Sequence, residues 1–130
     1  MKDYQDIYMT PGAFSWNELS SPDPKQACEF YGTLFGWRFD TMSMGDGPYH
    51  VIKVGDVGVG GIMAQQQPGP ALWGAYVTVE NCDATADKAR GLGAKVLAGP
   101  FDIPTIGRMA VLQDPQGGVV QVISYFPQPA

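Results

Sequence analysis

The stretch FSWNELSSPDPKQACEFYGTLFGW, residues 14–37, decides how the chain folds. Its first residues alternate between two sides of an extended chain, with Phe14, Trp16 and Glu18 on one side. This period of two is typical of a β-strand. The stretch therefore predicts a strand at the start of the fold.

A helix is predicted directly after this strand. Asp23 can cap its first turn, Pro24 suits the first helical position, and Gln26 is placed to complete a capping box. Gly36 predicts the end of the helix, because glycine adopts the left-handed cap conformation without steric cost. Trp37 then begins a second strand. We expect one apolar stripe of the helix to pack on a sheet, formed by Ala27, Phe30, Tyr31 and Leu34.

Two further strands are predicted after a connection of eight residues. TMSMGDGP, residues 41–48, is rich in glycine and methionine and predicts a flexible loop. Residues 49–54 and 57–63 have β-type composition, and the Gly-Asp pair between them suits a tight hairpin turn. The first module therefore reads strand, helix, strand, strand, strand over about residues 10–63.

The same order of elements returns in the second half of the chain. After a proline-containing linker at residues 64–71, a second module spans about residues 72–126, with Asn81 capping its helix and Gly93 ending it. Its strands are predicted at residues 73–79, 95–97, 109–112 and 119–125. One helix leaves a face of a four-stranded sheet uncovered, so two modules must pack together, within a chain or between chains. We expect one α+β domain, residues 1–130: two βαβββ modules in tandem that form a curved mixed sheet around a central cavity.

Composition limits the functions open to the chain. Its 13 acidic and 8 basic side chains give a net charge of -5, with no basic cluster, so nucleic acid is not expected as a partner. No run of about 18 apolar residues predicts a membrane span, and the first ten residues lack the apolar core of a signal peptide. We expect a cytoplasmic protein whose two cysteines, Cys28 and Cys82, are reduced thiols.

The doubled module resembles the vicinal oxygen chelate superfamily, which includes glyoxalase I, extradiol dioxygenases, fosfomycin-resistance enzymes and bleomycin-binding proteins. The matching stretches are ELSSPDPKQACEFYGTLFGW, VTVENCDATADKARGLGAKV and DPQGGVVQVI, and the resemblance covers about residues 14–126. The strings W-N-E-L and D-I-P-x-x-G-R-x-A-V are most similar to members described as glyoxalase-like. The resemblance implies the fold, but not one reaction, because the fold hosts many chemistries.

The resemblance also implies where a metal would be held. Metal-using members place ligands on the first and last strand of each module, and these positions fall at Trp16, Gly61, Gly74 and Gln121. None of the four is a normal ligand for zinc, iron or manganese, and the chain has one histidine. We therefore expect no metal and no other cofactor.

Side chains with the strand parity of Trp16 are expected to line the central cavity. They are Trp16, Glu18, Tyr76, Thr78 and Gln121. Gly61 and Gly74 leave space beside them, and an aromatic-lined cavity with a few polar groups is typical of a small-molecule site. The alternative is that Trp16 and Tyr76 fill this space as core residues.

Two further residues are placed by counting along the predicted hairpins. A two-residue turn sets His50 opposite Gly61, where it could work with Glu18 as an acid–base pair. Similar counting predicts that Arg108 points inward at the cavity mouth, where it could bind a carboxylate or carbonyl group. The alternatives are a surface or structural histidine and a solvated arginine at a strand end.

These observations favour a metal-independent protein that binds a small apolar or aromatic organic molecule. It would either sequester this ligand or act on it through Glu18 and His50. The alternatives are a metal-dependent lyase, isomerase or dioxygenase, and a non-catalytic interaction module. Free sheet edges also predict a homodimer.

Overall fold

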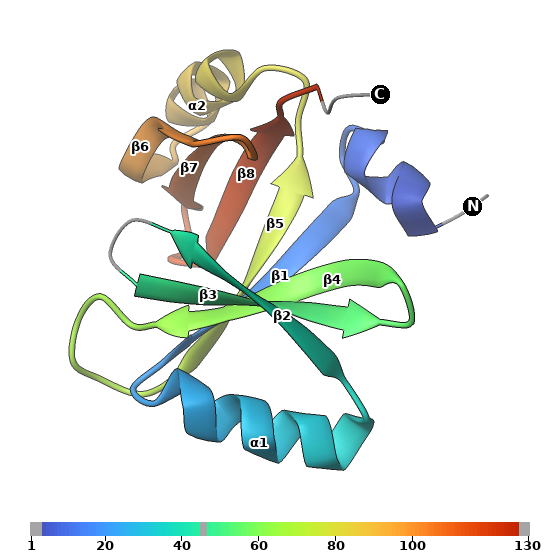
Figure 1. Cartoon of the computed structure of the whole chain (residues 1–130). Helices are drawn as coiled ribbons and strands as arrows, with labels where there is room; N and C mark the ends of the chain where they lie inside the picture. Colours follow the sequence, from blue (N-terminus) through green and yellow to red (C-terminus); the bar gives the residue numbers. More distant parts are fainter. Residues whose placement is uncertain (1–3, 45–46, 128–130) are drawn as a thin grey trace. The chain divides into compact units, whose positions relative to one another are not determined.

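The computed structural model describes residues 4–44 and 47–127 and has two α-helices and eight strands (Figure 1). In chain order the elements are a 3-10 helix η1 (Tyr4–Met9), β1 (Phe14–Ser21), α1 (Pro24–Phe35), β2 (Arg38–Met44), β3 (Gly47–Val54), β4 (Val57–Ala64), β5 (Leu72–Thr78), α2 (Cys82–Gly91), β6 (Lys95–Ile103), β7 (Gly107–Gln113) and β8 (Val119–Tyr125). The order strand, helix and three strands occurs twice. The predicted α+β fold of two βαβββ modules is confirmed.

The strands of each module are ordered in the same way. They follow β2-β3-β4-β1 in the first module and β5-β8-β7-β6 in the second. β1 pairs with β4 and β5 pairs with β8 in parallel, whereas the hairpin strands pair antiparallel, so the pairing is mixed. By compactness the chain divides into residues 16–74, here called the α1 unit, and residues 1–15 with 75–130, here called the α2 unit.

Helix α1 has the predicted ends. The carboxylate of Asp23 accepts a hydrogen bond of 3.1 Å from the backbone N–H of Gln26, and Gly36 ends the helix at a φ of 74°. Both features satisfy backbone groups that a helix end leaves without partners. The sequence signals for the two ends of this helix are therefore accurate.

The packing face of α1 differs from the predicted stripe. Ala27 and Tyr31 pack on the buried strand residues as expected, and Cys28 joins them. Phe30 and Leu34 are 58% and 57% exposed, so their prediction as core residues is wrong. Because Cys28 replaces them in the contact, the buried stripe is rotated around the helix and consists of Ala27, Cys28 and Tyr31. The strand residues under the helix are Leu19, Ile52 and Ile62.

The cap of α1 gives a first testable prediction. Replacing Asp23 with alanine removes the acceptor for the Gln26 N–H and is expected to lower the free energy of unfolding by about 1 kcal/mol. Urea denaturation followed by circular dichroism measures this change. Glu29→Ala, at an exposed carboxylate on the same helix, is the control and should change stability by less than about 0.5 kcal/mol. Equal effects of the two substitutions would contradict the capping role.

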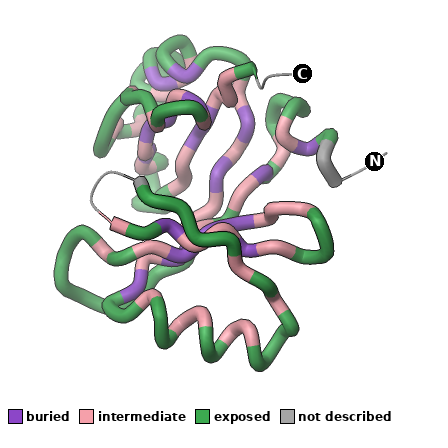
Figure 2. The backbone as a smooth tube through the Cα atoms, viewed as in Figure 1, coloured by how far each residue is buried: buried purple, intermediate pink, exposed green. Residues whose placement is uncertain are grey.

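Helix α2 is capped and buried on one side. The side chain of Asn81 accepts a hydrogen bond of 3.0 Å from the N–H of Ala84, as predicted from its capping position. Cys82 and Ala86 are buried, and Cys82 packs on strand residues Ala110, Leu112 and Val122. Figure 2 shows buried positions along the strands and on α2, whereas α1 has no fully buried residue.

Two strands, β2 and β6, run several residues past their predicted ends. β2 continues through residues 41–44, which were expected to form a loop, because it pairs with β3 along its whole length, including Thr41 with His50. These ladder bonds satisfy the backbone and override the loop-like composition. Residues 45–46 of the expected loop lie outside the described residues. β6 likewise runs to Ile103, with register shifts that accommodate the residues around Gly99.

None of the described helices has both the length and the apolar composition needed to cross a bilayer.

Candidate functional site

A β-bulge in the hairpin of β3 and β4 determines which side chains face Gly61. The two-residue turn is present, and Val54 lies opposite Val57 as predicted. The register then shifts, because Ile52 pairs with Gly60 whereas Lys53 pairs with Gly58. The extra residue on β4 moves every later pair by one position.

The predicted pairing of His50 with Gly61 is therefore wrong. His50 lies opposite Ile62, and Val51 lies opposite Gly61. Neighbouring residues of a strand point to opposite faces, so the shift replaces His50 by Tyr49 on the face of Glu18. Instead, the Nδ1 atom of His50 and the hydroxyl oxygen of Thr41 form a hydrogen bond of 2.8 Å.

Tyr49 joins Trp16 and Glu18 in a chain of hydrogen bonds within the α1 unit. The Tyr49 hydroxyl donates to Glu18 Oε2 over 2.7 Å and accepts the indole N–H of Trp16 over 2.8 Å. These three side chains are called the Glu18 cluster below. Sequence reasoning identified Trp16 and Glu18 but missed Tyr49, because it assumed a regular hairpin.

Glycines on β4 make room for this cluster. A Cβ atom on Gly61 would lie 2.0 Å from the Tyr49 hydroxyl oxygen, so only glycine permits the phenol to cross this strand. A Cβ on Gly58 would meet the side chain of Val51 at 3.3 Å and the Trp16 ring at 3.6 Å. Gly61 therefore positions Tyr49, instead of leaving the open space that the sequence predicted.

Burial differs within the Glu18 cluster in a way that suits ligand binding. Tyr49 is buried, with 8% of its surface exposed, whereas Trp16 and Glu18 are half-buried. The phenol is fixed by two hydrogen bonds and by the surrounding protein, and it orients the carboxylate. The arrangement presents an oriented carboxylate beside an indole ring, a combination that can bind an organic molecule and move a proton.

Tyr76, Thr78 and Gln121 belong to the α2 unit and share one face. Tyr76 pairs with Gln121 and Thr78 pairs with Ile123 across β5 and β8, as the predicted parity requires. Tyr76 is buried, and its hydroxyl donates to the sulfur of Met109 over 3.6 Å. Gln121 is half-buried.

The 3-10 helix η1 covers Thr78, which no sequence signal predicted. The Thr78 hydroxyl donates to the backbone carbonyl groups of Ile7 and Tyr8 over 3.5 and 3.4 Å. Thr78 is buried as a result. Gly74, also predicted to line the site, is a half-buried residue of the α1 unit.

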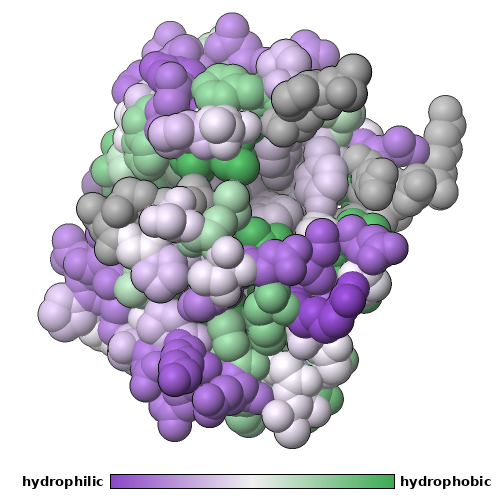
Figure 3. Space-filling model, in the orientation of Figure 1, coloured by the Kyte–Doolittle hydropathy of each residue, from purple (hydrophilic) through white to green (hydrophobic). Residues whose placement is uncertain are grey.

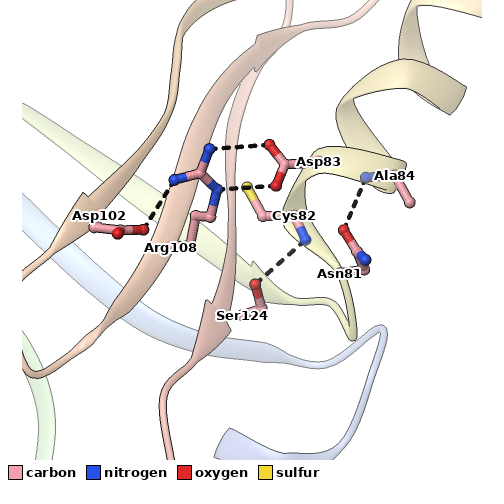
Figure 4. A network of polar contacts seen from close by, with 7 residues as sticks. All are labelled: Asn81, Cys82, Asp83, Ala84, Asp102, Arg108 and Ser124. Carbon is pink, nitrogen blue, oxygen red and sulfur yellow. Dashed lines mark hydrogen bonds and ion pairs between the residues drawn. The ribbon is translucent and has the colours of Figure 1, made fainter.

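Arg108 points toward α2, so its predicted inward orientation is wrong (Figure 4). Its guanidinium donates to both carboxylate oxygens of Asp83 on α2 and to Asp102 on β6, at distances of 2.9 to 3.1 Å. Met109 pairs with Ile123 and contacts Tyr76, so the neighbouring Arg108 must lie on the opposite, helix-facing side of β7. The hydrogen bonds to Asp83 and then Asp102 raise the pKa of the guanidinium, and the arginine links α2 to the β6–β7 hairpin.

The donor groups present do not fit a metal site of the kind that the fold implies. The four expected ligand positions carry an indole, two glycines and an amide, at Trp16, Gly61, Gly74 and Gln121. Within residues 4–44 and 47–127, no group of three or more His, Cys, Asp or Glu side chains is placed to hold a metal ion. Zinc, iron and manganese need such donors.

Both cysteines are protected thiols, which gives a second prediction. Burial raises the pKa of Cys28 and of Cys82, and for Cys82 the nearby Asp83 raises it further while Arg108 opposes the change. Because the thiolate is the reactive form, both thiols should react with a disulfide reagent at pH 8 more slowly in native protein than in urea. Cys82 is 1% exposed and should react more slowly than the half-buried Cys28.

The raised pKa values of Cys28 and Cys82 also determine how the stability of the fold depends on pH. A thiol whose pKa is raised by folding contributes stability below the pKa of the unfolded thiol, and this contribution is lost as pH rises through the folded pKa. Unfolding by urea at pH 7 and pH 10 should therefore show less stability at pH 10, by an amount reduced in Cys82→Ala. Equal reactivity of both thiols in native and unfolded protein would contradict their burial.

Residues 17–123 match the family model of the glyoxalase-like domain. The chain belongs to this family. The predicted membership of the vicinal oxygen chelate superfamily is confirmed, since this glyoxalase-like chain also has the fold of solved members. It superposes on methylmalonyl-CoA epimerase of Streptomyces coelicolor in complex with 2-nitronate-propionyl-CoA, with a TM-score of 0.71, 15% identity and coverage of 93% of this chain and 99% of that one.

A second solved epimerase and two curated relatives give similar matches. Methylmalonyl-CoA epimerase of Mycobacterium tuberculosis has a TM-score of 0.68, 14% identity and coverage of 89% of each chain. The candidate glyoxylase CFP32 of M. tuberculosis is 44% identical over 119 residues, and the anthracycline biosynthesis protein DnrV of Streptomyces peucetius is 32% identical over 128 residues. These matches cover 90% and 86% of this chain. The glyoxalase-like chain spans about half the length of both relatives, 46% in each case.

Proposed function

We propose that this glyoxalase-like chain binds a small apolar or aromatic organic molecule beside the Glu18 cluster and that Glu18 moves a proton of that molecule. The hydrogen-bond chain from Trp16 through Tyr49 to Glu18 carries the proposal. It orients a half-buried carboxylate next to an aromatic ring. One carboxylate falls short of the three or so donors that zinc, iron or manganese needs, and the described residues offer no such group, so we propose chemistry that is independent of a metal.

The reaction class that suits this geometry is proton transfer next to a carbonyl group. The Glu18 carboxylate accepts a proton from a carbon beside the carbonyl, and the electron pair of that C–H bond moves into the carbonyl to form an enolate. Return of the proton from Glu18 to a neighbouring carbon completes an isomerisation. Tyr49 keeps the carboxylate oriented through its hydrogen bond.

Trp16 is the residue on which the ligand is proposed to stack. Its half-buried ring is held by the indole N–H bond to Tyr49, so little side-chain freedom is lost when a ligand stacks on it. Stacking contributes roughly 0.5–1.5 kcal/mol beyond the area buried. The name of DnrV, an anthracycline biosynthesis protein, makes polycyclic aromatic compounds a suitable first group of test ligands.

A sequestering role is the second candidate, because the same cluster could hold a ligand without acting on it. His50 supports neither role directly, since its ring is hydrogen-bonded to Thr41 instead of Glu18. Replacing Glu18 distinguishes the two functions. A sequestering protein keeps its ligand affinity and has no turnover to lose, whereas an enzyme loses turnover when the carboxylate becomes an amide.

The test is a thermal-shift screen of acyl-CoA esters, aromatic keto compounds and anthracycline-type molecules, followed by turnover assays of each compound that binds. Ligand at 100 times its dissociation constant should add roughly 2.7 kcal/mol of stability. Glu18→Gln should abolish turnover, and Tyr49→Phe should reduce it by roughly tenfold to a hundredfold, whereas Glu29→Gln, an exposed carboxylate on α1, should leave it unchanged. Binding and turnover should survive EDTA. Turnover that persists in Glu18→Gln, or that requires an added metal ion, would overturn the proposal.

A further inference from the structure

Two cations of the α1 unit lie opposite each other on the face of the sheet that carries the Glu18 cluster. Arg38 on β2 pairs directly with Lys53 on β3, and residues in direct register share one face. The register of β3 with β2 is unbroken, because the bulge lies on β4. Tyr49 and Lys53 are four residues apart on β3, so both point to the face of Glu18. This face therefore holds two of the eight basic side chains of an acidic chain.

Gly58 lies between Lys53 and the Trp16 ring. Lys53 pairs with Gly58 across the hairpin, and a Cβ atom on Gly58 would lie 3.6 Å from the Trp16 ring. In the strand order β3-β4-β1 the lysine and the ring therefore flank a residue that has no side chain of its own. Adjacent strands lie about 4.8 Å apart, so β1 and β3 are roughly 10 Å apart. A flat ligand that stacks on Trp16 and reaches Lys53 is about as long as a bicyclic aromatic acid.

The opposed cations break a rule of sheet stability. Like charges directly opposite each other destabilise a pair of strands. Arg38 turns toward the hairpin, where it donates to the carbonyl group of Gly55 and lies 3.7 Å from Asp56 Oδ1. Lys53 turns to Asp40 instead, with 3.8 Å between its Nζ atom and Asp40 Oδ2. Residues that break such a local rule are expected mainly at functional sites, where binding an anion would offset the repulsion.

The ion pair of Lys53 with Asp40 is loose enough to exchange. The Lys53 side chain is 25% exposed, whereas that of Asp40 is 76% exposed, and 3.8 Å is too long for a hydrogen bond. Such a pair contributes little to stability, so another carboxylate can take the place of Asp40 at small cost. Figure 3 shows hydrophilic side chains beside hydrophobic ones on the surface over the strands of the α1 unit, a mixture that suits a ligand with an aromatic part and a charged group.

We propose that Lys53 binds the carboxylate of an aromatic keto acid that stacks on Trp16 and presents its keto group to Glu18. This inference rests on the proposed function and narrows its ligand from organic molecules in general to acids. A carboxylate suits the position because it replaces that of Asp40 with the same charge and geometry. The bound anion also lowers the repulsion between Lys53 and Arg38. Lys53 thus determines specificity and takes no part in the proton transfer.

The experiment compares two compounds that differ by one carboxylate, acetylnaphthoate and acetylnaphthalene, titrated into the full chain by isothermal calorimetry. The wild-type protein should bind the acid about tenfold more tightly than the neutral ketone, and this preference should shrink at high ionic strength. Lys53→Met keeps the apolar stem of the side chain and should bind both compounds equally, with the affinity for the neutral ketone unchanged. Asp40→Asn removes the competing carboxylate and should raise the affinity for the acid roughly threefold.

The matched control is Lys25→Met, which removes one positive charge from an exposed position on α1 and should keep the preference for the acid. Equal affinity of the wild-type protein for the two compounds, or a preference that persists in Lys53→Met, would overturn this inference and leave the proposed function intact. If Lys53→Met misfolds, an affinity for the acid that is unchanged in Asp40→Asn would overturn it as well. If neither compound binds to the wild-type protein, the proposed function fails together with this inference.

Discussion

Replacing Gly60 with alanine is expected to lower the free energy of unfolding by about 3 kcal/mol, the largest change that the structure predicts for a single added methyl group. A Cβ atom at this position would lie 2.2 Å from the backbone carbonyl oxygen of Asn17, its partner on β1. The obstacle is backbone, so no change of rotamer can relieve it. The parallel pairing of β1 with β4 must open instead.

Urea denaturation measures this loss directly, with Gly91→Ala as the matched control. Gly91 ends α2, and its added Cβ would meet nothing within 4 Å. Alanine also favours the helical conformation, so this control should gain up to about 1 kcal/mol. If Gly60→Ala lost less than about 1 kcal/mol, the close approach of β4 to β1 would be incorrect.

Replacing the adjacent Gly61 is expected to act through a side chain instead of the backbone. Its Cβ would lie 2.0 to 2.3 Å from the hydroxyl oxygen and two ring carbons of Tyr49. The phenol must leave its buried place and give up its bonds to Glu18 and Trp16. We expect a loss of about 2 kcal/mol in stability and loss of ligand binding at the Glu18 cluster.

A double-mutant cycle separates these two mechanisms. Tyr49→Ala removes the group that Gly61→Ala displaces, so the double variant should be no less stable than Tyr49→Ala alone. The same Tyr49→Ala change should leave the full effect of Gly60→Ala in place, because that clash involves Asn17 backbone. Additive effects at positions 49 and 61 would contradict the placement of the phenol over β4.

The sequence predicted the elements of the fold well, because local signals determine them. Asp23 and Asn81 cap helices as expected, and the Gly-Asp turn places Val54 opposite Val57. These features depend on a few neighbouring residues, whose conformational preferences are strong.

The site was predicted less accurately, because a bulge changes which residues face each other. Counting from the hairpin turn placed His50 at Gly61, and one extra residue on β4 brought Tyr49 there instead. The run of three glycines within residues 58–61 is a signal that could have predicted the bulge, since glycine inside a strand often marks one. Its exact position depends on packing with Trp16 and Val51.

Other differences arise from contacts between distant parts of the chain. Arg108 is oriented by Asp83, 25 residues earlier, and Thr78 is covered by η1, 71 residues before it. The packing stripe of α1 is determined by the strand residues under it, Leu19, Ile52 and Ile62, which lie before and after the helix in the chain. No periodicity in the sequence records these contacts, although the two modules themselves were predicted correctly.

The most direct test of the Glu18 cluster as the ligand site is a titration followed through the three indole N–H resonances in nitrogen-15 NMR spectra. Trp16→Phe assigns the signal of the indole that donates to Tyr49. A bound aromatic keto compound is predicted to shift this signal while those of Trp37 and Trp73 stay in place, and Gly61→Ala, which displaces Tyr49, should weaken the response at least tenfold. Ligands that shift only the Trp37 or Trp73 signals, or a Trp16 response unchanged in Gly61→Ala, would contradict the account.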